Sequence, residues 1–172
     1  MHFIMLIGCS GSGKSTIAED IRARNPSAVI ISSDQIIEDF AQAEGISYQE
    51  AYPAQADNAR DICEQTAVRA FERGLDVIWD QTNLQRSVRE KRLAMVPDGY
   101  TKIAVCLHGG LAAHRSRILA RASAGGRDIP REVSKRQISD MEMPDFDEGF
   151  DRIMAQEVTM PEPAAELSCA VA

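Results

Sequence analysis

A run of eight residues near the N-terminus has the types and spacing needed to bind phosphate groups. Residues 8–15 read G-C-S-G-S-G-K-S, which satisfies the pattern G-x-x-x-x-G-K-[S/T] at every position. Glycines let a backbone wrap closely around phosphate oxygens, and the N-terminus of a following helix adds partial positive charge. Because the run follows an apolar segment and precedes a helical pattern, it predicts a loop that binds a nucleoside triphosphate, rather than a chance Gly/Ser-rich turn.

The residues of this loop have different expected contacts. Lys14 should bridge the β- and γ-phosphates of ATP, Ser15 should bind Mg²⁺ through its hydroxyl oxygen, and Thr16 should lie near the α-phosphate. The other positions expected to contact the nucleotide are Gly8, Ser10, Gly11, Ser12 and Gly13. The sequence therefore predicts ATP and Mg²⁺ as cofactors.

Asp34 is the first acidic residue placed to act on what the loop binds. It follows Ser32 and Ser33 at the carboxyl end of an expected strand, residues 28–31, where a side chain can face the phosphate loop. A carboxylate there could accept the proton of an attacking hydroxyl as a general base. It could also cap the next helix, and the two roles are compatible.

A second acidic residue, Asp80, ends the expected strand at residues 75–79. This is the position of a Walker B-like carboxylate, so Asp80 is predicted to hold Mg²⁺ through water. Thr82 and Asn83 follow it and could orient an acceptor or a phosphate. The alternative is that residues 80–83 are only a turn that ends the strand.

Positive charge is concentrated in one third of the chain. Residues 86–136 contain 12 Lys/Arg and 4 Asp/Glu, although the whole chain has a net charge of −7. Such a local patch suits an anionic ligand and argues against a wide surface for nonspecific duplex binding. Arg86, Arg89 and Arg92 are the expected contacts for an acceptor's phosphates; the alternative is a solvated helix face.

The elements that must position these residues alternate along the chain. The expected strands are residues 3–7, 28–31, 75–79, 103–107 and 152–158, and helical patterns separate them. Apolar residues at positions 59, 62, 63, 67, 70 and 71 predict one face of a long helix that Gly74 ends. This order predicts an α/β fold of the P-loop NTPase type, with a five-stranded parallel sheet, helices on both faces, and the site at the carboxyl ends of the strands. Residues 122–129 are expected to form a basic, mobile lid. This P-loop domain should span residues 1–158, followed by a flexible tail at 159–172.

Bulk properties limit the class of protein further. At 172 residues with 44% hydrophobic residues, the chain is expected to form one globular domain. Its apolar runs are far shorter than the roughly 20 residues of a membrane span, and no signal peptide fits, so a cytoplasmic location is expected. Four dispersed cysteines predict no disulfide framework and no structural metal. The three histidines are expected at the surface or at strand ends. The sequence S-V-R-E at 87–90 predicts a capping box at the start of a short basic helix.

Other nucleotide-binding classes fit less well. The chain has no N-K-x-D motif for guanine and is too small for the oligomeric ATPase machinery with its sensor regions. Kinases need a base for the acceptor hydroxyl and arginines for the charge on the transferring group, and both are present here. A noncatalytic nucleotide switch is the alternative of a different class, but it would not need an acid such as Asp34 facing an acceptor.

Motifs spread over most of residues 3–154 carry a family resemblance. They are the phosphate loop, S-D at 33–34, D-x-T-N-L at 80–84, an arginine-rich segment before I-P at 129–130, Pro144, and E-G-F-D at 148–151. In this combination the chain resembles the polynucleotide kinase-type P-loop kinases, including the kinase module of phage polynucleotide 5′-kinases. The resemblance implies a location in a bacterial or phage-infected cell. It implies Asp34 as the base, Lys14 and Ser15 as phosphate and magnesium residues, and Arg121 or Arg127 as the arginine on the transferring phosphate.

The segment after Asp34 differs from that family. Phage 5′-kinases have an arginine there that holds a phosphate of the acceptor strand, whereas residues 35–39 are Q-I-I-E-D. Residues 44–50 are similar to phage kinases that phosphorylate 5-hydroxymethyluracil in DNA. We therefore expect ATP-dependent transfer to a hydroxyl of a nucleic acid, first a polynucleotide 5′-end and second a hydroxymethyl base, with a small molecule such as a sugar acid as the third possibility.

Overall fold

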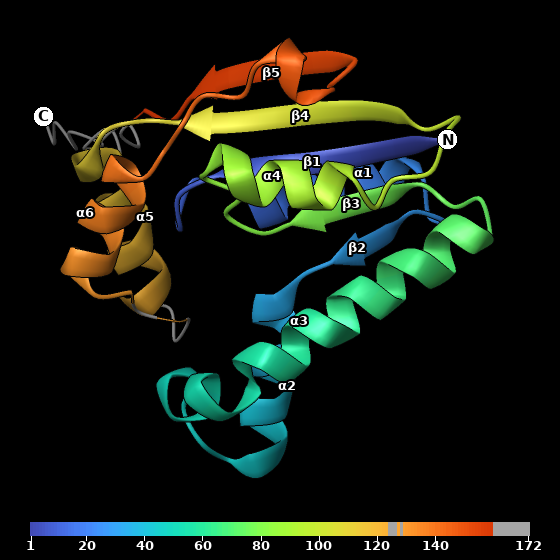
Figure 1. Ribbon diagram of the computed structural model, residues 1–172. Coiled ribbons are helices and arrows are strands. Elements are labelled where there is room, and N and C mark those ends of the chain that lie inside the picture. The colour runs from blue at the N-terminus through green and yellow to red at the C-terminus, as the bar shows by residue number, and fades with distance from the viewer. Residues whose placement is uncertain (124–126, 128, 160–172) are drawn as a thin grey trace, which may run out of the picture.

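Five parallel strands form the centre of the molecule, in the order β2-β3-β1-β4-β5 (Figure 1). The structure is a computed structural model and describes residues 1–123, 127 and 129–159. The strands are β1 His2–Gly8, β2 Val29–Ile31, β3 Val77–Asp80, β4 Thr101–His108 and β5 Arg152–Glu157. Each expected strand is present, with bounds that differ from the predicted ones by at most two residues, so the predicted α/β fold is confirmed.

The helices lie between the strands in sequence, as the alternating pattern predicted. They are α1 Lys14–Arg24, α2 Ser33–Glu44, α3 Tyr48–Glu72, α4 Arg86–Leu93, α5 Leu111–Ser123 and α6 Arg131–Ser139, with a short 3-10 helix, η1, at Phe146–Glu148. Figure 1 shows α5 and α6 at the end of the sheet to which the β4 arrow points, and α2 with the start of α3 below it. These helices therefore surround the carboxyl ends of the strands.

Alternation along β1 divides the core between the two faces of the sheet. Phe3 and Met5 pack in one large cluster with residues of α3 and α4, including Cys63 and Leu93. Leu6, from the other face of the same strand, packs with Ala18 of α1. Side chains of a parallel strand point alternately to its two faces, so helices on both sides are needed to cover them.

Two helix starts differ from the sequence prediction. Helix α3 begins at Tyr48, well before its apolar periodicity, because a capping box of Ser47 and Glu50 fixes its first turn. Helix α4 begins at Arg86 with Gln85 as its N-cap, and no side chain caps it. The predicted Ser87–Glu90 capping box is therefore wrong, since Ser87 already lies inside the helix.

Other expectations concern burial and the ends of the described segments. His114 is fully buried rather than exposed, because it lies on the inner face of α5. Most of the lid, 124–126 and 128, and the tail from residue 160 lie outside the described residues.

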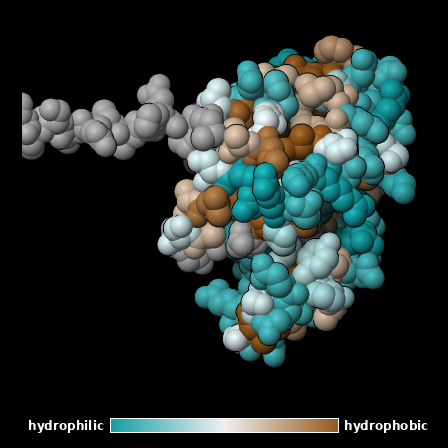
Figure 2. Space-filling model, turned by 90° about the vertical axis from the view of Figure 1, so that its left-hand side faces the viewer, coloured by the Kyte–Doolittle hydropathy of each residue, from teal (hydrophilic) through white to brown (hydrophobic). Residues whose placement is uncertain are grey.

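None of the helices in the described segments is long and apolar enough to cross a membrane. Hydrophilic side chains cover most of the face in Figure 2, with hydrophobic ones scattered among them.

Candidate active site

The phosphate loop joins β1 to α1 and depends on glycine at defined positions. Gly8 has φ 152° and Gly11 has φ 79°, values that L side chains rarely adopt. A Cβ atom on Gly8 would lie 2.5 Å from the carbonyl oxygen of Leu107, and one on Gly11 would lie 2.8 Å from Cγ1 of Ile118. The loop is therefore packed directly against β4 and α5, which fixes its path.

Lys14 is the first residue of α1 and crosses back over the loop. Its side chain is buried, and its Nζ atom donates a hydrogen bond to the carbonyl oxygen of Cys9 at 2.9 Å. Burial lowers the pKa of the ammonium group, while the negative charges of Asp80 and Asp34 oppose this shift. Lys14 therefore lies between the loop and both carboxylates that the sequence singled out.

One cavity of about 860 Å³ brings most of the predicted residues together. Its lining includes Ser10, Gly11, Gly13, Lys14, Ser15, Thr16, Asp34, Asp80, Thr82, Arg121 and Arg127. Six predicted residues do not line it, namely Gly8, Ser12, Asn83, Arg86, Arg89 and Arg92. The cavity lies where the phosphate loop meets the ends of β2 and β3.

Asp34 occupies the first turn of α2, and it does not cap that helix. Ser32 is the N-cap, since its hydroxyl oxygen accepts a hydrogen bond from the amide of Gln35. The Asp34 carboxylate is half exposed and accepts hydrogen bonds from the Tyr48 hydroxyl and from Arg127, each at 2.7 Å. Burial raises its pKa, but Arg127 and Tyr48 outweigh burial, so the pKa of Asp34 is lowered overall.

Of the two candidate arginines, Arg127 contacts the carboxylate directly. Besides Asp34 it pairs with Glu38 at 3.5 Å, and its guanidinium lies 4.2 Å from the centre of the Tyr48 ring. Arg121 donates instead to the backbone oxygen of Arg127, at 3.1 Å. Both line the cavity, but Arg127 is the one bonded to Asp34.

Asp80 lies at the end of β3, close to the first turn of α1. It is buried, and burial raises its pKa, against a hydrogen bond with Ser15 and the charge of Lys14, which lower it; the charge of Asp34 adds to the rise. A carboxylate and a hydroxyl are the hard oxygen donors that Mg²⁺ uses alongside phosphate oxygens and water. Ser15 and Asp80 therefore fit a magnesium ion.

The residues after Asp80 connect the end of β3 to β1 by hydrogen bonds. The backbone oxygen of Thr82 accepts a hydrogen bond from the amide of Gly8 at 2.9 Å, and the Asn83 side chain donates to the backbone oxygen of Leu6 at 2.8 Å. Asn83 is buried and has φ 48°, a left-handed conformation that Asn tolerates. Thr82 thus faces the cavity, while Asn83 ties its loop to β1.

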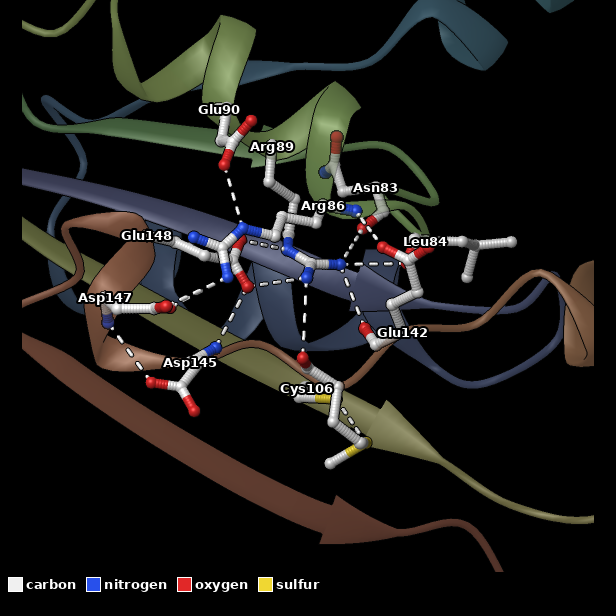
Figure 3. Close-up of polar contacts among 11 residues, drawn as sticks. Asn83, Leu84, Arg86, Arg89, Glu90, Cys106, Glu142, Asp145, Asp147 and Glu148 are labelled. Atoms are coloured by element: carbon white, nitrogen blue, oxygen red, sulfur yellow. Dashed lines mark hydrogen bonds and ion pairs between the residues drawn. The ribbon is translucent and has the colours of Figure 1, made fainter.

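Arg89 was predicted to contact the phosphates of an acceptor, but the structure places it in the interior. It is fully buried and forms an ion pair with Glu148, with both nitrogen–oxygen distances 2.7 Å (Figure 3). The same guanidinium donates to the backbone oxygens of Leu84 and Glu142, at 2.8 and 3.0 Å. An acceptor cannot reach it, so Arg89 joins the D-x-T-N-L and E-G-F-D segments instead.

The two other arginines of the expected patch also have acidic partners. Arg86 lies between Glu90 and Asp147, at 2.8 and 3.0 Å, and is half-exposed (Figure 3). Arg92 pairs with Glu64 at 2.7 Å and lies over the Trp79 ring. Much of the positive charge on α4 is therefore neutralised within the protein.

Three residues that the sequence analysis did not select also contact the site. Arg117 of α5 lines the main cavity and a second one of about 220 Å³, which also includes Thr16 and Val158. Gln137 of α6 accepts a hydrogen bond from the amide of Ser10 at 2.8 Å. Tyr48 bonds to Asp34. Arg117 could have been predicted from its spacing, since it lies one helical turn before Arg121. No sequence pattern pointed to Gln137 or Tyr48.

Comparisons with known proteins agree with this fold. A family model described as an AAA domain matches residues 3–144. A gluconokinase from Sinorhizobium meliloti 1021 is 24% identical with a TM-score of 0.61, over 93% of this chain and 84% of that one. A putative kinase from Chloroflexus aurantiacus is 20% identical with a TM-score of 0.73, over 94% and 87%. A chain of the Pnkp1/Rnl/Hen1 RNA repair complex is 17% identical with a TM-score of 0.64, over 81% of this chain but 44% of that one.

Proposed function

We propose that this chain is a kinase that transfers the γ-phosphate of ATP to a hydroxyl group. The chain belongs to the AAA domain family, and its phosphate loop is complete. The observation that carries this proposal is the convergence of Lys14, Asp34 and Asp80 on one cavity. A nucleotide switch has no need of a carboxylate at the position of Asp34. A kinase needs one there to receive the acceptor's proton.

Each residue has a defined task in this reaction. The acceptor oxygen attacks the γ-phosphorus and gives its proton to Asp34, while the bond from the γ-phosphorus to the β–γ bridging oxygen breaks and ADP leaves. The lowered pKa of Asp34 keeps its carboxylate ionised at neutral pH. Lys14 and Arg127 would stabilise negative charge on the transferring group.

Ser15 and Asp80 would hold the magnesium ion that accompanies ATP. The ion would supply positive charge to the phosphate oxygens. The buried Asp80 carboxylate has Lys14 as its neighbouring positive charge, and a bound cation would add to this compensation. The cavity beside Thr16 and Arg117 would take the nucleoside part of ATP, since it adjoins the same loop.

The acceptor half of the cavity favours a small polar molecule. Away from the phosphate loop its lining includes, besides Arg121 and Arg127, the residues Gln35, Glu38, Ile62, Cys63, Thr66 and Gln81. These six side chains are neutral or acidic, so they suit hydroxyl groups better than a chain of phosphates. The pairing of Arg86, Arg89 and Arg92 with carboxylates removes the main physical argument for a polynucleotide.

A nucleic-acid hydroxyl is the second candidate acceptor. Its support is the motif combination that resembles polynucleotide kinases, together with three arginines, Arg117, Arg121 and Arg127, that line the cavity. These arginines could bind a phosphate of an acceptor strand as well as those of ATP. Either a 5′-end or a hydroxymethyl base would fit this second reading.

Incubation with γ-labelled ATP tests the proposal directly. The panel of acceptors should contain sugars, sugar acids, nucleosides, a 5′-hydroxyl oligonucleotide and DNA containing hydroxymethyluracil. We expect label on a small polar acceptor, and no label with the Asp34→Asn variant. ATP binding without transfer to any member of the panel would support a nucleotide switch instead.

A further inference from the structure

Tyr48 touches both groups that the proposed reaction uses around the acceptor. Its hydroxyl donates to Oδ1 of Asp34 at 2.7 Å, and its ring lies under the Arg127 guanidinium, 4.2 Å away. Arg127 in turn contacts Oδ2 of Asp34 at 2.7 Å. We infer that Tyr48 is a positioning residue that orients the Asp34 carboxylate and holds Arg127 beside it, an inference that rests on the proposed kinase function.

The chain holds Tyr48 in place by local structure. Tyr48 is the first residue of α3, directly after the N-cap Ser47. The Ser47 amide donates to Glu50 at 2.8 Å, and the Glu50 amide donates to the Ser47 hydroxyl at 3.3 Å, which closes the capping box. Phe40 and Ile37 of α2 belong to the same apolar cluster as Tyr48. The capped start of α3 and the packing of the α2–α3 pair therefore fix where the phenol points.

The two carboxylate oxygens of Asp34 have different partners, which suggests different tasks. Oδ2 is paired with Arg127, which is expected to contact the transferring phosphate during the reaction. Oδ1 is bonded to Tyr48, which has no charge to give to phosphate. When the Arg127 guanidinium exchanges Oδ2 for an oxygen of the phosphate, the Tyr48 hydroxyl would keep the carboxylate in its orientation, so that Oδ2 can accept the proton of the acceptor hydroxyl.

The hydrogen bond from Tyr48 also affects when Asp34 can act as a base. Donation to the ionised form lowers the pKa of Asp34, alongside the stronger effect of Arg127. The other titratable groups that act on Asp34 or respond to its charge are Lys14, Cys63, Asp80 and Arg121. None of these is altered by removing the Tyr48 hydroxyl, so a pH profile isolates its contribution.

Tyr48→Phe is the first test, because it removes one hydroxyl and keeps the ring under Arg127. We expect kcat to fall about 10-fold, the effect of one lost hydrogen bond, with an unchanged KM for ATP. The acid limb of kcat/KM for the acceptor should move to higher pH, because the pKa of Asp34 rises when a donor is lost. Tyr52→Phe is the matched control: Tyr52 lies one turn later, with its ring 5.7 Å from that of Tyr48.

Tyr48→Leu is the second test, because it also removes the ring from Arg127. It should lower kcat further than Tyr48→Phe, and Arg127→Ala should then cost less in the Leu background than in the wild type. If the wild type is active and Tyr48→Phe has the same rate and pH profile, the role of Tyr48 is overturned and the proposed function is not. A wild-type chain that transfers phosphate to no acceptor would overturn the proposed function, and this inference with it.

Discussion

The ammonium group of Lys14 donates to the carbonyl oxygen of Cys9, 2.9 Å away across the phosphate loop. Lys14 thus bonds to the same loop in which it is expected to bind the phosphates of ATP. A triphosphate would offer the same ammonium group charged oxygens, which make stronger hydrogen bonds than a carbonyl. The nucleotide should therefore displace Cys9 as the partner of Lys14.

Lys14→Met should abolish transfer and weaken the binding of ATP. The variant keeps the length of the side chain but removes the charge that contacts the β- and γ-phosphates. Backbone amides of the loop remain, so ATP affinity should fall without being lost. Calorimetric titration with ATP and a rate measurement would check both points, with the exposed Lys91→Met as control. Unchanged turnover in folded Lys14→Met protein would refute the assignment of the loop.

Asp34→Asn should lower kcat by at least about 100-fold while ATP affinity stays close to that of the wild type. The amide keeps the shape of the side chain but cannot accept the acceptor's proton. Asp39→Asn, on the exposed side of the same helix, is the matched control. If ATP affinity collapsed while turnover stayed high, Asp34 would have a structural role rather than that of a base.

Most of the fold was predictable because it is written in local patterns. The strands appear as apolar, β-branched runs, and β4 carries such a run over residues 103–107. The start of α3 was missed because residues 48–58 are mostly polar and include Pro53, so no apolar stripe marks them. Only the Ser47–Glu50 pair signals that helix start, and a capping box is a weaker pattern than periodicity.

The site was predictable where its residues follow the chain in order. Asp80 ends β3, and Lys14 and Asp34 lie in the first turns of the helices that follow β1 and β2. Parallel strands bring these strand ends to one edge of the sheet. The role of Arg89 was mistaken because its partner, Glu148, is 59 residues away and no spacing rule connects them. The contact of Arg127 with Asp34 spans 93 residues and likewise follows only from the three-dimensional arrangement.

Arg127→Ala should slow transfer more than Arg121→Ala. Arg127 lies next to the base and can reach the transferring group, whereas Arg121 is bonded to the backbone of Arg127. Its removal should also raise the pKa of Asp34, so the acid limb of the rate profile should move to higher pH. The exposed Arg131→Ala is the control. Equal rates for both variants and the wild type would show that neither arginine takes part in transfer.

Breaking the ion pair of Arg89 and Glu148 should destabilise the fold. Both side chains are at most 1% exposed, and loss of one partner leaves a buried, uncompensated charge, which costs about 3–5 kcal/mol of unfolding free energy. Glu148→Gln should therefore lower the urea midpoint strongly. Arg86→Met, at the exposed neighbouring pair, should change it little. If Glu148→Gln unfolded like the wild type, water must reach the pair in solution.

The dependence of the acceptor KM on salt should distinguish a small acceptor from a polynucleotide. A polynucleotide releases counterions when arginines bind its phosphates, so its KM should rise steeply between about 50 and about 200 mM salt. A small uncharged acceptor should show almost no dependence.

Replacing Arg86 and Arg92 by Gln locates any salt effect. Both side chains already pair with carboxylates outside the main cavity, so the double variant should leave the acceptor KM unchanged. A steep salt dependence that the double variant retains would assign phosphate binding to Arg117 and Arg121 inside the cavity, and would favour the nucleic-acid reading. A steep dependence that the double variant abolishes would contradict the small acceptor and restore the basic surface of α4 as the acceptor site. A flat salt profile in both proteins would leave a small polar molecule as the acceptor, because no multiply charged strand could bind without releasing ions.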